Sequence, residues 1–210
     1  MTYNKPWVPK VVQCLRWPYN SVIMMNLRKL VLMLSLLVCF VFRSGGRETP
    51  TTCDSSALPA PAQHLLTVKF SKWRPKLVSD LDTDDQQLWV AAKQGKTCPG
   101  MVAGHFETED KISYALLLVP KSNANAGYKI IVLSEDASDN SYQWKVVDHA
   151  DAGAELGLVI SKVPPGKYSD WDGNKSIQLK LDGLQVEWME SAALVYYWSS
   201  GQYRSIQVSD

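Results

Sequence analysis

The chain has 210 residues, of which 46% are hydrophobic and 20% are charged, and its formal net charge at pH 7 is +1. This near balance conceals two segments. Residues 1–46 contain six Lys or Arg residues and no acidic residue, whereas residues 47–210 contain 16 basic and 21 acidic residues, a net charge of −5. An acidic body without a basic stripe excludes the electrostatic pattern of a nucleic-acid-binding protein, and a basic leader before an acidic body is typical of an exported protein.

The leader contains an apolar run of 13 residues, 30–42, directly after Arg28 and Lys29. A signal-peptide core takes about 7–15 apolar residues, whereas a membrane-spanning helix takes about 20. Small residues follow at 44–46. We therefore expect residues 1–46 to hold a signal peptide that is cleaved before Arg47, which places the body in the periplasm or outside the cell.

Two alternatives for the leader stay open. An uncleaved leader would anchor the protein in the inner membrane, and this would be its membrane contact. Residues 1–23 contain three prolines and two tryptophans and do not resemble the start of a signal peptide. A chain that begins at Met24 or Met25 would have a conventional start, so we expect the true start codon there.

The next segment, residues 47–63, is rich in Pro, Ser, Thr and Ala and is expected to be a linker. Residues 64–210 are expected to form a single β-rich domain. Its first predicted strand is Leu65–Phe70, which Pro75 would end because proline cannot donate to a strand ladder.

Of the four cysteines, Cys14 and Cys39 belong to the leader, and Cys53 and Cys98 remain in the body. Two cysteines in an oxidising compartment predict one disulfide, and this one would close a loop of about 45 residues. Such a loop is worth roughly 3–5 kcal/mol of stability. A metal site or a nucleophile is disfavoured, because there is no Cys-x-x-Cys and no neighbouring histidine.

One helix is predicted near residues 84–94. Thr83 and Gln86 have the spacing of a capping box, and Gly95 stands where a helix often ends. The apolar residues at helical spacing are Leu88, Ala91 and Ala92, with Trp89 beside them.

Apolar runs separated by turn residues predict eight strands after this helix. The runs are Ser113–Val119, Tyr128–Leu133, Tyr142–Val147, Leu156–Val163, Ser176–Leu181, Leu184–Met189, Ala193–Trp198 and Tyr203–Val208. Asp182-Gly183 between two of them is a strong hairpin signal. The predicted fold class is α+β and mainly antiparallel β, with a curved or folded-over sheet of about seven to eight short strands and one N-terminal helix.

Two stretches carry a family resemblance. Gly104–Phe106 followed by Ser113–Val119 resembles the strand segments of FG-GAP/VCBS-type repeats in exported bacterial proteins. Val195–Trp198 and the residues after it are similar to the closing segments of exported bacterial proteins of unknown function. The resemblance implies export and a β fold. The calcium loop of the repeats needs an Asp/Asn ladder, and Glu107–Asp110 lacks its glycine turn.

Few residues have the spacing of a catalytic or metal site. His64, His105 and His149 are too far apart in the chain for metal-ligand spacing. Asp148 with His149, or Asp170, would serve a divergent hydrolase, although a solvated loop explains the first pair equally well. We expect no catalytic residues and no cofactor.

A calcium loop is the alternative considered for a metal. Asp170, Asp172 and Asn174 begin like such a loop, but Lys175 and Leu181 occupy the positions of its glycine and its bidentate glutamate. A turn is favoured there, and no metal is expected.

Aromatic residues are the best remaining indication of a binding surface. Aromatic side chains on a sheet can bind sugars, peptides or a protein, and core packing is the plain alternative. The candidates are Trp171, Tyr196, Tyr197 and Trp198, and the last three cannot all face inward on one strand. The sequence thus favours an exported, non-enzymatic domain that binds a protein or glycan partner in the cell envelope. A secreted enzyme inhibitor and a divergent hydrolase are the alternatives.

Overall fold

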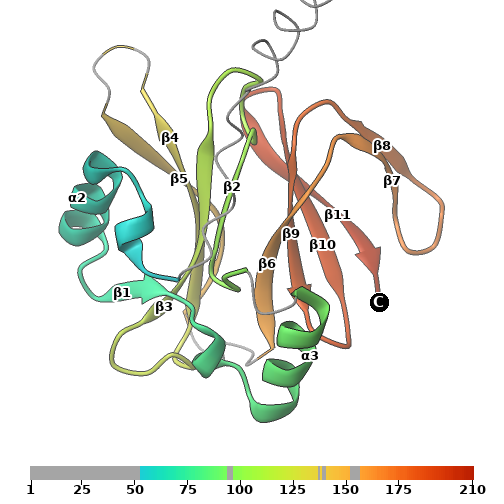
Figure 1. Cartoon of the computed structure of the whole chain (residues 1–210). Coiled ribbons are helices and arrows are strands. Elements are labelled where there is room, and N and C mark those ends of the chain that lie inside the picture. The colour runs from blue at the N-terminus through green and yellow to red at the C-terminus, as the bar shows by residue number, and fades with distance from the viewer. Residues whose placement is uncertain (1–52, 94–96, 137, 139–140, 152–156) are drawn as a thin grey trace, which may run out of the picture. The chain divides into compact units, whose positions relative to one another are not determined.

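The structure is a computed structural model of the whole chain (Figure 1). It describes residues 53–93, 97–136, 138, 141–151 and 157–210. These belong to one compact unit, Arg47–Asp210. The predicted leader, its cleavage site and the start at Met24 or Met25 lie outside the described residues. Within the described part, no helix is both long and apolar enough to span a membrane.

The described residues are mainly antiparallel β, with 11 strands and few helices. The helical elements are the 3-10 turns η1 (Ser55–Ala57) and η2 (Val78–Asp80) and the α-helices α2 (Ala60–Lys69) and α3 (Thr83–Lys93). The strands are β1 (Trp73–Pro75), β2 (Met101–Gly104), β3 (Ser113–Pro120), β4 (Tyr128–Glu135), β5 (Tyr142–Ala150), β6 (Leu158–Val163), β7 (Gly166–Ser169), β8 (Ser176–Leu179), β9 (Gly183–Trp188), β10 (Ala193–Ser199) and β11 (Gln202–Ser209).

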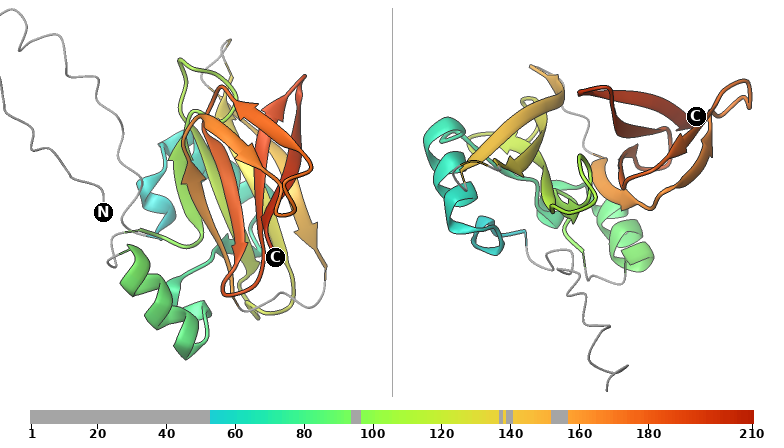
Figure 2. Two further views of the ribbon diagram at one scale, coloured as in Figure 1. Left: turned by 90° about the vertical axis from the view of Figure 1, so that its right-hand side faces the viewer. Right: turned by 90° about the horizontal axis from the view of Figure 1, so that it is seen from above.

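The strands form two main sheets and a two-stranded hairpin. The first sheet has the order β1-β3-β4-β5, and β2 also pairs with β3; the second has the order β11-β10-β9-β6. Strands β7 and β8 pair with each other. Figure 2 shows the two main sheets from the side and from above, with the β7–β8 hairpin extending from the second sheet.

Strands β1 and β2 share one edge of β3, one after the other. The N–H of Lys76 donates to the carbonyl of Leu117, and the N–H of Leu117 donates to the carbonyl of Gly100. A Cβ atom at Gly100 would lie 2.4 Å from the backbone N and O of Lys76. Glycine is therefore required where these two backbones meet.

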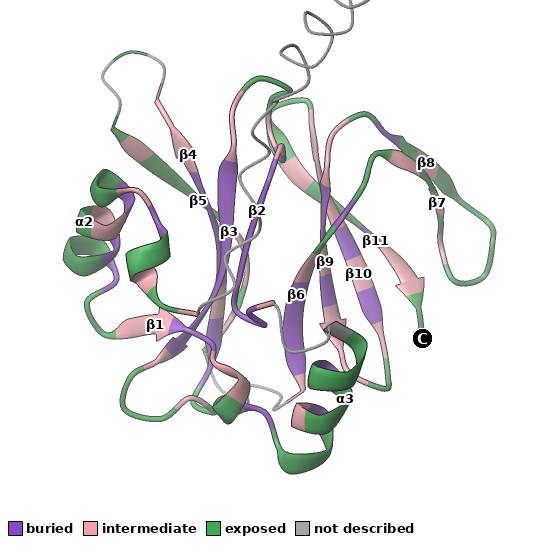
Figure 3. Ribbon diagram, viewed as in Figure 1, coloured by how far each residue is buried: buried purple, intermediate pink, exposed green. Residues whose placement is uncertain are grey.

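Four apolar clusters hold the layers together, and buried residues occupy the middle of the strands (Figure 3). The inner faces of the two sheets meet in a cluster that includes Leu117, Ile130 and Leu184. Helix α2 covers the outer face of the first sheet. The β7–β8 hairpin covers the outer face of the second sheet, and α3 packs through Trp89 against Val159.

All eight strands predicted after the helix are present, but the strand count of seven to eight was too low. The hairpin predicted at Asp182-Gly183 is wrong, because β8 pairs with β7 in the two-stranded sheet whereas β9 pairs with β6 and β10 in the second sheet. Strands β1, β2 and β7, of three or four residues each, were not predicted. A second α-helix, α2, is present in addition to the predicted one, and the strands lie in two main sheets with a separate hairpin.

The strand predicted over Leu65–Phe70 is wrong, because this segment belongs to α2. Pro61 stands in the first turn of the helix, where proline is well tolerated. Every fourth residue contributes to the cluster under the helix: Leu58, Ala62, Leu66 and Phe70. Residues 53–63, expected to be linker, thus hold η1 and the start of a packed helix.

Helix α3 agrees with the predicted helix to within one residue at each end, but its cap and buried face differ. Asp82 caps it, since its carboxylate accepts the N–H of Asp85 at 2.9 Å. Trp89 is the buried apolar residue of the helix, whereas Leu88, Ala91 and Ala92 are exposed. The helix packs on the sheet through the one large side chain of Trp89, so Leu88 and the two alanines are left at the surface. Gly95 lies outside the described residues.

Candidate functional site

A groove of about 500 Å³ lies where three segments meet: the residues after β2, the residues from β8 to β9, and the end of β10. We call it the aromatic groove. Its lining residues are Glu107, Thr108, Glu109, Gln178, Leu179, Lys180, Leu181, Asp182, Tyr197, Trp198 and Ser199. Two of the four aromatic residues predicted to bind a partner, Tyr197 and Trp198, are among them.

Tyr197 and Trp198 lie on opposite faces of β10 because side chains alternate along a strand. Trp198 is paired with Tyr203 of β11, and their rings meet edge to face with centroids 5.1 Å apart. The ammonium group of Lys145 lies 4.9 Å from the Trp198 ring centroid. Tyr197 packs against the cluster under the β7–β8 hairpin. Both rings are therefore held in place by packing.

Glu107 connects both sheets at the groove. Its carboxylate accepts a hydrogen bond from Lys145 of β5 at 2.8 Å and another from the hydroxyl of Tyr203 at 3.1 Å. Its side chain is only 10% exposed. Burial, and then the charge of Glu107, raise the pKa of Tyr203, which keeps this tyrosine protonated as a donor. Glu107 is thus a fixed wall of the groove.

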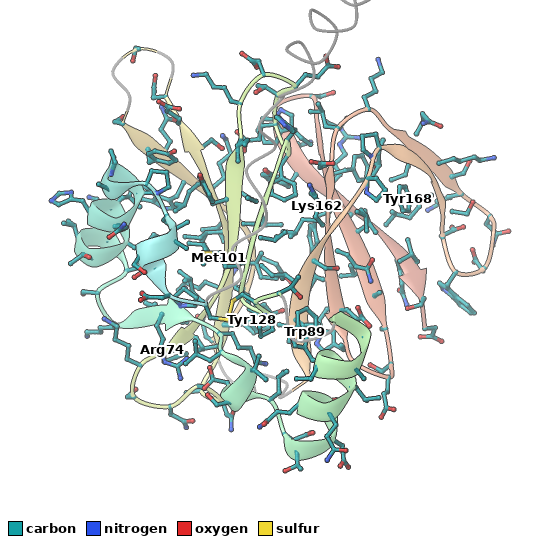
Figure 4. All side chains as sticks on the ribbon, in the orientation of Figure 1. Arg74, Trp89, Met101, Tyr128, Lys162 and Tyr168 are labelled. Atoms are coloured by element: carbon teal, nitrogen blue, oxygen red, sulfur yellow. A yellow bond between two sulfur atoms is a disulfide. The ribbon has the colours of Figure 1, made fainter. Side chains whose placement is uncertain are left out.

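Asp182 fixes the opposite wall. One of its carboxylate oxygens accepts the N–H of His105 at 2.8 Å and lies 3.7 Å from the ammonium group of Lys162. The N–H of Asp182 in turn donates to the carbonyl of His105. These contacts tie the β8–β9 turn to the residues after β2. Figure 4 labels Lys162 of β6, the cation near Asp182, and Tyr168 of the neighbouring β7–β8 hairpin.

The two other candidate aromatics lie elsewhere. Tyr196 packs between the sheets, where its hydroxyl donates to Asp148 at 3.1 Å. Burial, and then the charge of Asp148, raise the pKa of Tyr196. Trp171 is 58% exposed in the turn of the β7–β8 hairpin. Its backbone N–H donates to the carbonyl of Gln207 in β11. The structure therefore separates the four candidates into three locations.

The residues considered for a hydrolase are not brought together. One carboxylate oxygen of Asp148 accepts the hydroxyls of both Tyr128 and Tyr196, and the other accepts the backbone N–H of His149. The side chain of His149 is exposed. Asp170 lies in the β7–β8 turn, where it accepts the N–H of Lys175.

The residues considered for calcium shape that same turn. Asp170 and Lys175 are joined by hydrogen bonds in both directions, and Asp172 accepts the backbone and side-chain N–H groups of Asn174. These bonds account for the spacing of the polar residues as turn chemistry. In the described ranges, no three His, Cys, Asp or Glu side chains are grouped as metal ligands.

The predicted disulfide is confirmed. Cys53 is bonded to Cys98, with Cα atoms 5.1 Å apart and a separation of 45 positions in sequence. Cys98 is buried in the cluster under α2, and Cys53 packs against the edge of this cluster. The bond joins the segment before η1 to the residues just before β2.

The charged residues of the groove were missed by sequence reasoning. Glu107 and Asp182, which line the groove, and Lys145, which binds Glu107, are distant in sequence, and Asp182 was interpreted only as a hairpin turn residue. No signal in the chain pairs them, because the pairing arises when the two sheets meet. No protein-family model, curated protein or solved structure matches this chain. The resemblance to FG-GAP/VCBS repeats thus stays a sequence-based expectation.

Proposed function

We propose that this protein is an exported, non-enzymatic binding domain that holds a segment of a cell-envelope glycan in the aromatic groove. The observation that carries the proposal is a groove that combines two aromatic rings with walls of hydrogen-bonding side chains. Its volume of about 500 Å³ falls in the usual range of ligand sites, about 300–1,000 Å³.

The chemistry of the groove suits a sugar. The C–H faces of a pyranose ring pack on the face of an aromatic side chain, and its hydroxyls need hydrogen-bond partners. Thr108, Glu109, Gln178 and Ser199 supply hydroxyl, carboxylate and amide groups along the lining. Glu109 and Lys180 carry opposite charges, which suits a ligand that is polar and close to neutral.

Rigidity supports the same conclusion. Glu107 is held by Lys145 and Tyr203, and Asp182 is held by the residues after β2. A groove that is already formed loses little conformational entropy on binding. These carboxylates act in the proposal as fixed acceptors and not as acid–base groups.

Calorimetric titration of the full chain with β-1,4-linked N-acetylhexosamine oligosaccharides tests the proposal. We expect Trp198→Ala to weaken binding at least about tenfold, as for a residue that carries a large share of an interface. Gln178→Ala, at an exposed position, should weaken binding without affecting the packing at Tyr203. Trp171→Ala is the matched control and should leave binding unchanged. Equal affinity of the wild type and both groove variants would contradict the proposal.

Export has its own test. Mass spectrometry of the protein from the envelope of expressing cells should give a chain that begins near Arg47. Recovery of the intact chain from membranes alone would instead support an anchored leader.

Enzyme inhibition is the second candidate function, and the β7–β8 turn favours it. Trp171 is presented there on a turn fixed by five hydrogen bonds within residues 170–175 and by its bond to β11. Fixed, exposed segments with one aromatic anchor are common in tight protein interfaces. An inhibitor would form a stoichiometric complex with an enzyme. Trp171→Ala would abolish this complex while leaving glycan binding intact.

A further inference from the structure

A second surface lies on the far side of the first sheet, between α2 and β5. This α2–β5 groove has a volume of about 380 Å³ and is lined by His64, Leu65, Val68 and Lys69 of α2 and by Tyr142 and Trp144 of β5, among others. It shares no lining residue with the aromatic groove. An inference about it therefore does not rest on the proposed function.

Exposed apolar side chains lie in this groove and directly beside it: Val68 and Trp144 line the groove, and Val146 follows Trp144 on the same face of β5. Val68 is 56% exposed, Trp144 is 40% exposed and Val146 is 52% exposed, and these are three of the six large apolar side chains exposed in the described residues. Trp144 lies opposite Leu133 and Val146 lies opposite Ile131, on the face of the sheet that α2 packs against. The helix therefore leaves part of the β5 side of this face uncovered.

Strand β5 also offers a sheet edge. In the described part of the chain it pairs with β4 alone. Its pairing shifts by one position after Val146, because Ile131 lies opposite Val146 and Ile130 opposite Asp148. Such a bulge bends a strand and ends regular pairing. Residues 143–146 are thus the regular part of an edge that could accept another strand.

Two lysines and one glutamate border the uncovered strip. The ammonium group of Lys69 lies 5.7 Å from the Trp144 ring centroid. Below the strip, Lys129 lies opposite His149, and its ammonium group is 4.9 Å from the Trp73 ring centroid. Glu135, opposite Tyr142, places an acidic group at the other end. Lys69 and Lys129 outnumber Glu135 along the strip, so its local charge favours a negatively charged segment of a partner.

We propose that the α2–β5 groove docks an extended segment of a partner protein that pairs with residues 143–146 of β5. Its groove-facing side chains are apolar and contact Val68, Trp144 and Val146, and its flanking side chains are acidic and meet Lys69 and Lys129. A peptide edge supplies the backbone donors and acceptors that β5 needs, which a lipid surface does not. A concave groove also suits an inserted side chain better than a flat bilayer.

Fluorescence anisotropy of the full chain with a labelled peptide tests this proposal. The probe is acetyl-Asp-Glu-Thr-Val-Thr-Val-Thr-Glu-Asp-amide. One comparison peptide has lysine at every acidic position, and another has the acidic sequence with N-methyl groups on alternate peptide nitrogens. We expect the acidic probe to bind at least about tenfold more tightly than either comparison peptide.

Variants locate the binding site on the protein. Val146→Asp should weaken the acidic probe at least about tenfold, and Val68→Asp should do the same from the helix side of the groove. Val90→Asp is the matched control, because Val90 is 47% exposed on α3, outside the groove. Lys69→Glu should reduce the preference for the acidic probe over its lysine counterpart.

The outcomes decide between occupants. Unchanged thermal midpoints for Val146→Asp and Val68→Asp would confirm that weaker binding is local. Equal binding of the N-methylated peptide would overturn strand addition, and equal loss in Val90→Asp would overturn the location. Binding to phosphatidylglycerol vesicles that depends on Val146, with no binding of the acidic probe, would overturn the protein partner in favour of a lipid surface.

Discussion

Removing the Cys53–Cys98 disulfide should lower the free energy of unfolding by about 4 kcal/mol. The bond joins residues 45 positions apart. The loss of loop entropy in the unfolded chain, roughly 2.1 + 1.5R ln n cal/mol/K, gives about 13 cal/mol/K for this loop and therefore about 4 kcal/mol at 25 °C. A typical domain has only about 5–15 kcal/mol of stability, so the bond carries a large share of it.

The two cysteines differ in burial, so replacing each in turn separates the contribution of the crosslink from that of side-chain packing. Cys98 is buried among the residues under α2, whereas Cys53 is only partly buried. Cys53→Ala should therefore lose mainly the crosslink contribution, and Cys98→Ala should lose the same contribution plus about 1 kcal/mol for the buried sulfur atom. The double variant should resemble Cys98→Ala, because the crosslink is lost only once.

Urea unfolding followed by tryptophan fluorescence measures these differences. The free energy of unfolding of the oxidised wild type should also fall less steeply with urea than that of the variants, because its crosslinked unfolded state exposes less surface. Reduction of the wild type with dithiothreitol should bring its midpoint to that of the double variant. A loss below about 1 kcal/mol in Cys53→Ala would refute the entropic reasoning for this loop.

Three further predictions follow from buried groups. Burial lowers the pKa of Lys76 to about 8, so between about pH 8 and 10.5 the unfolded chain binds more protons than the folded chain and the free energy of unfolding rises with pH. Lys76→Met should remove this rise of up to about 3 kcal/mol, which urea unfolding at several pH values measures. Asp148→Ala should cost about 2–3 kcal/mol because two tyrosine hydroxyls lose their acceptor, and Asp148→Asn should cost less because an amide oxygen still accepts; equal losses would contradict this role. Gly100→Ala should cost about 3 kcal/mol or more through the backbone clash, whereas Gly166→Ala, with no atom closer than 3.8 Å to the new Cβ, should be nearly neutral in thermal unfolding.

Much of the fold was predictable because its signals are local. Alternation of apolar and polar residues, with turn residues between the runs, marks the strands by local sequence alone. Asp84 and Asp85 in the first turn, with a polar cap before them, mark the start of α3 in the same way. The same local signals do not say which strands pair, so Asp182-Gly183 predicted a hairpin although β8 and β9 lie in different sheets. The disulfide needed only the count of cysteines in the body and an oxidising compartment.

The errors arose where distant segments decide. Leu65–Phe70 has β-forming residues, but Ala62, Leu66 and Phe70 bury one helical face on the first sheet, and this tertiary packing selects the helix. Strand β1 contains Pro75, which is tolerated because the strand is only three residues long and pairs on one side with β3.

The candidate site divides along the same line. The sequence by itself determined that the tyrosine and tryptophan side chains near the end of β10 point to both faces of the strand, since that follows from the period of two. It did not determine that Tyr197 and Trp198 line a groove while Tyr196 binds Asp148, nor that Glu107 meets Lys145 and Tyr203. Only the tertiary structure decides these contacts, because they join residues 38 to 96 positions apart that meet when the two sheets pack face to face.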